Sequence, residues 1–231
     1  MDIFNREEMV IGHDNVLKLN GSNVIVFGLG GVGGGVCEAL ARSGIGNITI
    51  VDKDVVDETN INRQLIATTK TIGLKKTDVM EERLKSINPE INVKKIYINV
   101  NRETINDFDF SEYDYIADAI DTVTSKILLA EKAKESGTKI IMSMGMGNKL
   151  DPTKIEIADI NKTSVCHLAR VMRREFKKRN IKDVLVAYSK EEARKPFFKL
   201  EDESTPGSIS FVPPVCGMIM AGAIVRDLIS L

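Results

Sequence analysis

A glycine-rich turn between two short apolar runs is the feature that most constrains the fold of this chain. The sequence reads Val24-Ile-Val-Phe-Gly-Leu-Gly-Gly-Val-Gly33, and a second apolar run ends at Asp52. This order predicts a strand, a tight turn that opens a helix, and a second strand that ends in a carboxylate. Gly28 permits the turn, Gly30 lets the backbone approach a phosphate, and Gly33 lets the helix pack closely on the sheet.

The same stretch predicts a nucleotide-binding site. Unpaired amides at a helix N-terminus attract an anion, and a carboxylate placed like Asp52 can accept hydrogen bonds from ribose hydroxyls. We therefore expect the nucleotide to contact Gly28, Gly30, Gly31, Gly33 and Asp52. The alternative is a glycine turn with a purely structural role.

Apolar runs of strand length alternate with helical segments, which predicts a parallel sheet covered by helices. The expected strands are 23–28, 47–52, 91–99, 113–118 and 139–144, and the expected helices are 32–43, 74–87 and 122–136. Further along we expect an antiparallel strand over 154–160, a helix over 166–180, a loop over 191–206 and a buried helix within 211–231.

The predicted fold class is therefore α/β: a Rossmann-like, mostly parallel sheet covered by helices, with a smaller C-terminal α+β extension. We expect a single domain over residues 1–231. Within it, 1–145 would form the nucleotide-binding core, and 146–231 a substrate-facing extension with a basic helix over 165–180.

Charge and cysteine content exclude several classes of protein. The chain has 32 Lys+Arg against 33 Asp+Glu, so binding to nucleic acid would need a local basic patch. Three cysteines without C-x-x-C spacing exclude a disulfide framework and a four-thiolate zinc site within the chain. The N-terminus shows no secretion signal, and the apolar run 211–231 is interrupted by prolines and charges. We expect a cytoplasmic protein with no zinc site and no membrane partner.

A polar and cationic cluster follows the second strand, where an NAD-dependent dehydrogenase needs little more than the rest of its sheet. Arg63 and Lys76 in this cluster suit a triphosphate better than the pyrophosphate of NAD. Asp121 follows a later strand, at the carboxyl edge where open α/β sheets bind ligands, and a carboxylate there can hold Mg²⁺. The cluster favours ATP and Mg²⁺ as cofactors. The alternatives are ordinary solvated charges, an NAD-dependent oxidoreductase, or a nucleotide-binding scaffold without catalysis.

A series of motifs follows in a characteristic order: Gly28-Leu-Gly-Gly-Val-Gly33, Asp52-Lys-Asp54, Asn60-Ile-Asn-Arg63-Gln64, Gly73-x-x-Lys76 and Asp118-x-x-Asp121. In this order they resemble the adenylation core of the ubiquitin-activating-like family, whose bacterial members include ThiF, MoeB and HesA. The resemblance implies that Asp52 binds the ribose and that Asp121 binds Mg²⁺. It also implies nucleotide contacts, several of them to the triphosphate, from Asp54, Asn60, Arg63, Gln64 and Lys76.

The resemblance also implies a homodimer and a reaction. Phe4-Asn5-Arg6 is similar to a family segment in which an arginine reaches the ATP phosphates of the partner subunit, so Arg6 would act in trans. In this family a carboxylate attacks the α-phosphate of ATP and gives an acyl-adenylate and pyrophosphate. Such a reaction needs positioning and charge neutralisation, and Arg6, Arg63, Lys76 and Asp121 are the expected catalytic residues.

The second half of the chain differs from family members that activate sulfur carriers, which usually have two C-x-x-C pairs and a cysteine in the crossing loop. Only Cys166 and Cys216 are available here, and a structural role is the simpler interpretation of both. A basic segment over 165–179 is a candidate surface for a phosphate backbone, through Arg170, Arg173, Arg174, Lys177 and Lys178. The alternative is a solvated helix face.

Three segments resemble the branch of tRNA threonylcarbamoyladenosine dehydratases. They are this basic segment, Val186-Ala-Tyr-Ser-Lys-Glu-Glu192 and Pro206-Gly-Ser-Ile-Ser-Phe-Val-Pro-Pro214. The resemblance implies an ATP-dependent ligase/dehydratase that adenylates the carboxylate of threonylcarbamoyladenosine in tRNA and drives its cyclisation, with tRNA as partner. The alternative is adenylation of a ubiquitin-like sulfur-carrier protein, which would make a sulfur-transfer or carrier protein the partner.

Overall fold

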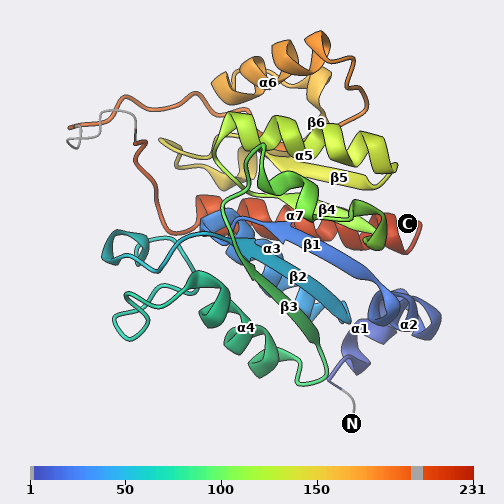
Figure 1. Ribbon diagram of the computed structural model, residues 1–231. Helices are drawn as coiled ribbons and strands as arrows, with labels where there is room; N and C mark the ends of the chain where they lie inside the picture. Colours follow the sequence, from blue (N-terminus) through green and yellow to red (C-terminus); the bar gives the residue numbers. More distant parts are fainter. Residues whose placement is uncertain (1–2, 199–204) are drawn as a thin grey trace.

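The computed structural model describes residues 3–198 and 205–231, which form a sheet with helices on both faces (Figure 1). Within these residues seven strands lie in the order β3-β2-β1-β4-β5-β7-β6. The strands are β1 (Asn23–Phe27), β2 (Asn47–Asp52), β3 (Asn92–Tyr97), β4 (Tyr115–Asp118), β5 (Lys139–Ser143), β6 (Ile155–Asp159) and β7 (Leu185–Ser189). All neighbours pair in parallel except β6 and β7. The predicted α/β class and the antiparallel strand are confirmed.

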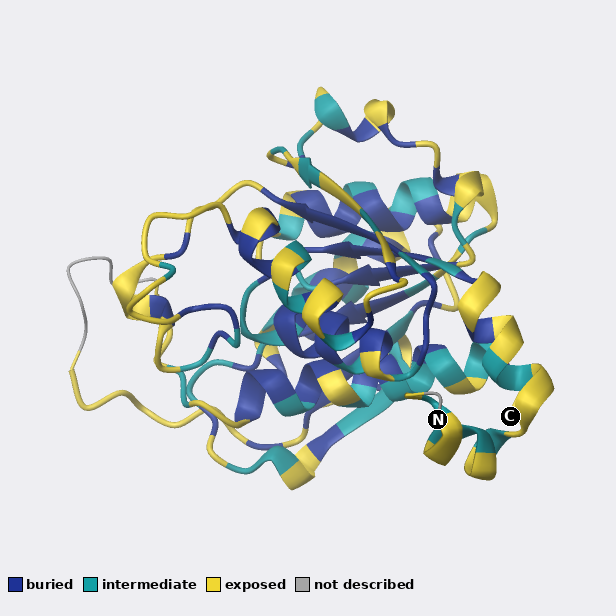
Figure 2. Ribbon diagram, turned by 90° about the horizontal axis from the view of Figure 1, so that it is seen from below, coloured by how far each residue is buried: buried dark blue, intermediate teal, exposed yellow. Residues whose placement is uncertain are grey.

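Alternate residues of the central strands point to opposite faces, and helices cover both. In β1, Val24 and Val26 belong to a core shared with α3, α4 and α7, whereas Ile25 and Phe27 belong to a core shared with α5. Figure 2 shows the central strands buried between exposed outer surfaces. The helices are α1 (Asn5–Ile11), α2 (His13–Gly21), α3 (Gly31–Arg42), α4 (Lys76–Ile87), α5 (Val123–Ser136), α6 (His167–Lys178) and α7 (Val212–Leu228). Short 3-10 turns are η1 (Glu58–Asn60), η2 (Thr104–Asp107), η3 (Phe110–Glu112), η4 (Pro152–Lys154) and η5 (Ile160–Lys162).

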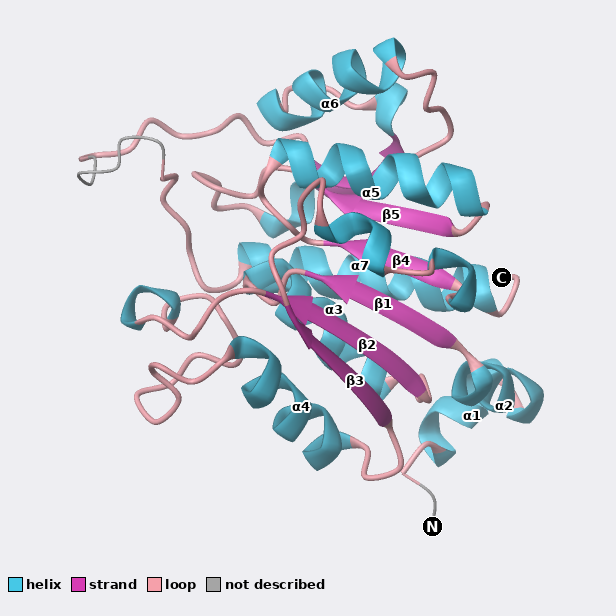
Figure 3. Cartoon of the chain, in the orientation of Figure 1, coloured by secondary structure: helices cyan, strands magenta, loops and turns pink. Residues whose placement is uncertain are grey.

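The order of the strands reverses between β1 and β4, because β2 and β3 lie on one side of β1 and β4 and β5 on the other. The connections that follow β1 and β4 therefore diverge and leave a crevice at the carboxyl ends of the strands, where such sheets bind ligands. Figure 3 shows long loops gathered at this edge of the sheet.

Helix α7 packs closely against α3, the helix that the glycine turn opens. A Cβ on Gly35 of α3 would lie 2.4 Å from the Pro214 carbonyl oxygen, and one on Gly217 of α7 would lie 2.1 Å from the Val32 carbonyl oxygen. The two backbones can approach this closely only because both positions lack a side chain. α7 is the helix predicted within 211–231. Within the described part of the chain, no helix is both long and apolar enough to cross a bilayer.

Other elements differ in detail from the sequence predictions. The sequence analysis did not predict α1 and α2, which are separated by Gly12 at a φ of 83°. Strand β3 is shorter than predicted, and the residues that follow it, 98–100, turn toward the crevice. In the predicted loop over 191–206, the described residues 191–198 and 205–206 form no helix or strand, and 199–204 lie outside the described residues.

Candidate active site

The turn after β1 requires glycine at two positions. Gly28 has a φ of 86°, and a Cβ there would lie 2.8 Å from the Ala119 carbonyl oxygen. A Cβ on Gly33 would lie 1.7 Å from the carbonyl oxygen of Gly28. The absence of side chains therefore brings the N-terminus of α3 against the ends of β1 and β4, where its unpaired amides can face an anion.

Asp52, the last residue of β2, holds this turn in place. Its Oδ2 accepts a hydrogen bond from the Leu29 amide at 2.6 Å, and its Oδ1 accepts one from the Asp54 amide at 2.8 Å. The residue is buried but lines the crevice. Because each carboxylate oxygen can accept more than one hydrogen bond, Asp52 can also accept from the hydroxyls of a ligand.

A pocket of about 250 Å³ occupies the crevice. It brings together most of the predicted nucleotide-binding residues, namely Gly28, Gly30, Gly31, Asp52, Asp54, Arg63, Gln64, Lys76 and Asp121. Sequence reasoning missed other lining residues, among them Lys53, Asn99, Ser125 and Pro213. Lys53 lies within the Asp52-Lys-Asp54 motif, whereas Asn99, Ser125 and Pro213 follow β3 or belong to α5 and α7 and reach the pocket only through tertiary folding.

Lys76 enters the pocket from the first turn of α4. Its ammonium lies 3.2 Å from Oδ2 of Asp54, and its side chain is only 7% exposed. The backbone fixes this position, because Val55 pairs with Lys75 in an isolated bridge and the Lys76 amide donates to the Asp54 carbonyl oxygen at 3.1 Å. The pocket thus contains a largely desolvated cation with one exposed counter-ion.

Arg63 supplies a second cation, and its direction is set by the chain just before it. Its Nη1 donates to the Thr59 carbonyl oxygen and to Oδ1 of Asn62, both at 2.9 Å. Asn60 does not line the pocket. Its Oδ1 accepts from the Asp57 amide at 3.2 Å in a capping box that shapes the turn. The phosphate contact expected of Asn60 remains a prediction.

Gln64 carries a polar atom without a partner. Its Oε1 is buried and accepts no hydrogen bond from any described residue. Its Nε2 lies on the side of Gly30, where an added Cβ would be 3.8 Å away. An unsatisfied buried acceptor costs about 1–3 kcal/mol. The residue itself lines the pocket.

A buried ion pair supports the loop that carries Asp121. Lys126 of α5 places its Nζ 2.8 Å from Oδ2 of Asp118, with both side chains 0% exposed, and donates to the Ser143 carbonyl oxygen at 2.7 Å. The Oδ1 of Asp118 accepts from the Ile120 amide at 3.0 Å. Burial raises the pKa of Asp118, and the ammonium of Lys126 opposes that shift. Lys126 was not among the predicted site residues, because a lysine within a helix gives no sign that it points inward.

Asp121 itself is exposed at the rim of the pocket. Its Oδ1 accepts from Oγ1 of Thr122 at 3.3 Å, and its Oδ2 has no protein donor among the described residues. Within the described ranges, no three His, Cys, Asp or Glu side chains are grouped to hold a metal alone. A single exposed carboxylate at the rim of the pocket fits the donor chemistry of Mg²⁺, which takes few protein oxygens together with phosphates and water.

Arg6 is exposed on α1 and does not line the pocket of its own chain. Figure 1 shows α1 near the amino ends of β1 and β2, whereas the pocket lies at the carboxyl ends. Arg6 can therefore take part only in a pocket of another copy of the chain.

The predicted basic helix corresponds to α6. Arg170, Arg174, Lys177 and Lys178 are exposed along it, and Arg173 is half-buried.

The cysteines are buried free thiols, and Cys166 lies at the N-cap of α6. Burial raises the pKa of the Cys216 thiol to about 12, which keeps it protonated at neutral pH.

The model of the ThiF family matches residues 4–231. The chain belongs to the ThiF family. This ThiF family protein is 42% identical over 239 residues to the tRNA threonylcarbamoyladenosine dehydratase of Bacillus subtilis (strain 168), an alignment that covers 98% of this chain and 94% of that protein. Solved structures of the Escherichia coli tRNA N6-threonylcarbamoyladenosine dehydratase, TcdA, in complex with ATP and with AMP are each 30% identical to it, with TM-scores of 0.90. Each match covers 98% of this chain. It covers 93% of the chain in the ATP complex and 94% of the chain in the AMP complex. The predicted family is confirmed, and so is the similarity to its dehydratase branch.

Proposed function

We propose that this ThiF family protein is an ATP-dependent adenylating dehydratase that acts on tRNA. It adenylates the carboxylate of threonylcarbamoyladenosine and drives the cyclisation of that group with net loss of water. The observation that carries the proposal is the pocket, where the N-terminus of α3 meets three cations, Lys53, Arg63 and Lys76. Similarity to the Bacillus subtilis dehydratase and to TcdA bound to ATP and AMP supports the choice of nucleotide and substrate.

The residues of the pocket bind and orient ATP. The amides of α3 and the side chains of Arg63 and Lys76 attract the triphosphate, while Asp52 accepts hydrogen bonds from the ribose. Asp121 would hold Mg²⁺ together with phosphate oxygens and water, and the ion would neutralise phosphate charge. These groups hold the α-phosphate where a carboxylate can reach it, which is the main requirement of this reaction.

The chemistry consists of two substitutions. A carboxylate oxygen of the substrate bonds to the α-phosphorus of ATP, and the bond to the β-phosphate oxygen breaks, so pyrophosphate leaves. A nitrogen or oxygen of the same modification then attacks the acyl carbon, loses a proton and expels AMP, which carries away the carboxylate oxygen. Ring closure within one side chain has a high effective concentration. No enzyme thioester is needed, which agrees with the burial of Cys166 and Cys216.

The proposal includes a homodimer. Large apolar side chains of the N-terminal segment face solvent, with Met9 86%, Val10 83% and Ile3 62% exposed. Apolar side chains grouped in this way favour burial against a partner. Arg6 lies on the same helix as Met9 and Val10, so a dimer formed through α1 supports the delivery of Arg6 to the ATP phosphates of the partner subunit. A cytoplasmic setting agrees with the free thiols.

Pyrophosphate exchange tests the proposed function. Purified protein is incubated with ATP, labelled pyrophosphate and tRNA that carries threonylcarbamoyladenosine, and the nucleosides are then analysed by mass spectrometry. Label should enter ATP only when the modified tRNA is present, and the modified nucleoside should lose the mass of one water. The proposal would be overturned if exchange depended on a carrier protein instead of the modified tRNA. It would also be overturned if protein active in exchange left the mass of the tRNA nucleoside unchanged.

A further inference from the structure

A concave basic surface, here called the α6 cleft, lies apart from the ATP pocket and shares no residue with it. It has a volume of about 580 Å³. Its polar lining consists of four cations and two amides: Arg173, Arg174, Lys177, Lys182, Asn161 and Asn180. No carboxylate lines it among the described residues. Because the whole chain has a net charge of −1, this is a local concentration of positive charge.

The end of α6 gives the cleft a rigid frame. The Ile181 amide donates to the Phe176 carbonyl oxygen at 3.0 Å, while Asn180 adopts a left-handed φ of 51°. This pattern closes the helix and turns Ile181 into the core, where it is 5% exposed. The Nζ of Lys134 on α5 donates to the Asn180 carbonyl oxygen at 2.8 Å. The turn therefore holds Asn180 and Lys182 against the last turn of α6.

Some of the cations on α6 already have protein partners. Arg173 donates to the Thr163 carbonyl oxygen at 3.0 Å and so ties α6 to the segment before it. The ammonium of Lys178 lies 2.6 Å from Oε1 of Glu175. The structure therefore gives two of the five residues predicted to bind tRNA an intramolecular role.

The other cations of α6 and of the cleft have no protein partner among the described residues. Among the described residues, the side chains of Arg170, Arg174, Lys177 and Lys182 form no ion pair or hydrogen bond. Arg170, Arg174 and Lys177 follow one another at spacings of four and three residues, so they form one stripe about 10 Å long. Like charges at this spacing destabilise a helix by a few tenths of a kcal/mol. A stripe that repels itself in the free protein is stabilised when an anion binds along it.

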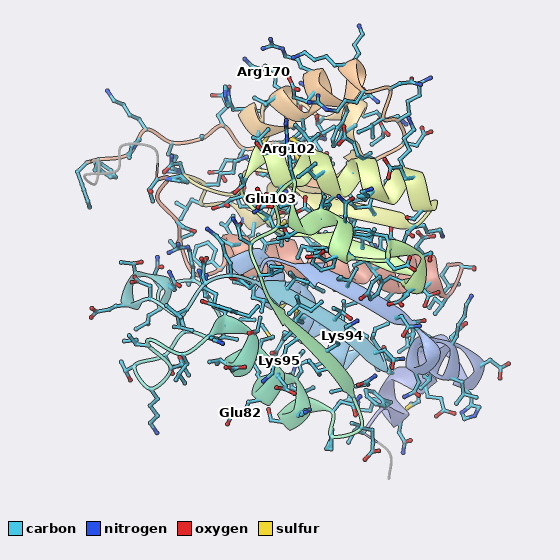
Figure 4. The ribbon with its side chains drawn as sticks, in the orientation of Figure 1. Glu82, Lys94, Lys95, Arg102, Glu103 and Arg170 are labelled. Atoms are coloured by element: carbon cyan, nitrogen blue, oxygen red, sulfur yellow. The ribbon has the colours of Figure 1, made fainter. Side chains whose placement is uncertain are left out.

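The stripe runs from the carboxyl edge of the sheet, where the ATP pocket lies, toward the α6 cleft. The start of α6 lies at the carboxyl end of β5, where a Cβ on Gly145 would be 3.8 Å from Cβ of Leu168. The cleft lies at the opposite end, beside the start of β7, because Asp159, just before η5, pairs with Leu185. Figure 4 shows Arg170 on the outer surface of α6. Unpaired cations therefore extend from the ATP-binding edge to a cleft remote from it.

We propose that this stripe and the α6 cleft bind the phosphodiester backbone of the tRNA at a point away from the reacting adenosine. Spaced cations followed by a concave group of cations and amides suit a long polyanion better than a single small anion. The inference rests on the proposed function and adds a site that sets affinity for tRNA without touching ATP. Its contribution to binding is independent of the threonylcarbamoyl group.

Salt-dependent binding tests the α6 cleft. The test protein is Lys177→Gln with Lys182→Gln. The control is Lys94→Gln with Lys85→Gln, which removes equal charge from the edge strand β3 and from α4, where Lys85 is paired to Glu81. Dissociation constants for tRNA with and without threonylcarbamoyladenosine are measured by filter binding over a series of KCl concentrations, together with the ATP dissociation constant.

We expect the slope of log affinity against log salt to become shallower by about 1.5 in the cleft variant, which corresponds to tRNA binding at least about tenfold weaker at 0.1 M salt. Both tRNAs should be affected equally, with ATP binding unchanged and the control close to wild type. If the wild-type protein cyclises the modified tRNA but the two variants bind it equally well, the cleft assignment is wrong and the proposed function stands. If the wild-type protein neither binds tRNA nor alters it, the proposed function fails first.

Discussion

Replacing Lys126 with methionine should destabilise the protein in a strongly pH-dependent way. The ammonium of Lys126 is the only cation paired with Asp118 among the described residues, and both side chains are fully buried. Methionine has a similar length and fills the space without supplying charge. The variant therefore leaves a carboxylate in the core with one hydrogen bond from a backbone amide.

The magnitude follows from the proton that Asp118 must then bind. Without its cation, burial raises the pKa of the Asp118 carboxyl further, whereas an aspartate in the unfolded chain has a pKa near 3.9. Holding the group protonated at pH 7 costs about 1.36 kcal/mol for each of roughly three units, or about 4 kcal/mol. This agrees with the 3–5 kcal/mol typical of breaking a buried pair by removing one partner.

The direction of the change in the pKa of Asp118 on folding determines how the loss of stability varies with pH. Between the two pKa values the folded variant holds a proton that the unfolded chain releases, so stability falls as pH rises. The loss relative to wild type should be about 4 kcal/mol at pH 7 and only about 1–2 kcal/mol at pH 5.

Urea unfolding followed by circular dichroism at both pH values measures this loss, since the chain contains no tryptophan for fluorescence. The double variant with Asp118→Asn removes the titrating group, so its stability should not show this dependence on pH. A single-variant loss that is the same at pH 5 and pH 7, or a double variant that keeps the dependence, would refute the reasoning.

Three further predictions concern the glycine turn, an ion pair on α3 and the metal site. Gly33→Ala should lower the free energy of unfolding by about 3 kcal/mol or more, because its Cβ would lie 1.7 Å from the Gly28 carbonyl oxygen. Gly21→Ala, with nothing within 4 Å, should be close to neutral in the same urea titration. Burial alone would raise the pKa of Glu38, but hydrogen bonds from Arg83 and Arg42 hold the pKa below its usual 4.5. Glu38→Gln should therefore cost about 1 kcal/mol at pH 7, and thermal unfolding should show this deficit vanish as acid protonates the wild-type carboxylate. Asp121→Ala should abolish pyrophosphate exchange with an unchanged unfolding curve, and normal exchange would remove the metal assignment.

The sheet and its glycine turn are predictable because their signals are local. The run from Val24 to Phe27 is buried throughout, as expected of a strand covered on both faces, and Gly28 and Gly33 occupy positions that exclude a side chain. Arg63 and Lys76 were also predicted as a pair, but from the family resemblance and their charge. The position of Lys76 depends on backbone pairing between Val55 and Lys75, which no local pattern reveals.

Contacts that depend on which way a side chain points, or on how the helices pack, are not predictable from the local sequence. Lys126 on α5 is buried against the carboxylate of Asp118, which ends β4, and Pro213 lines the pocket because α7 packs against α3. The basic segment was predicted as one surface, yet Arg173 and Lys178 have protein partners, since Thr163 and Glu175 lie within reach. Composition reports charge but not whether a neighbour already neutralises it.

The tight packing of α3 against α7 has a consequence for the order of events during synthesis. The glycines that open α3 leave the ribosome early, but the helix that wedges against Gly35 emerges much later. A nascent chain that has made only the first strands therefore carries an unsupported loop where ATP will sit. Competence to bind ATP should therefore arrive only after α7 has been made.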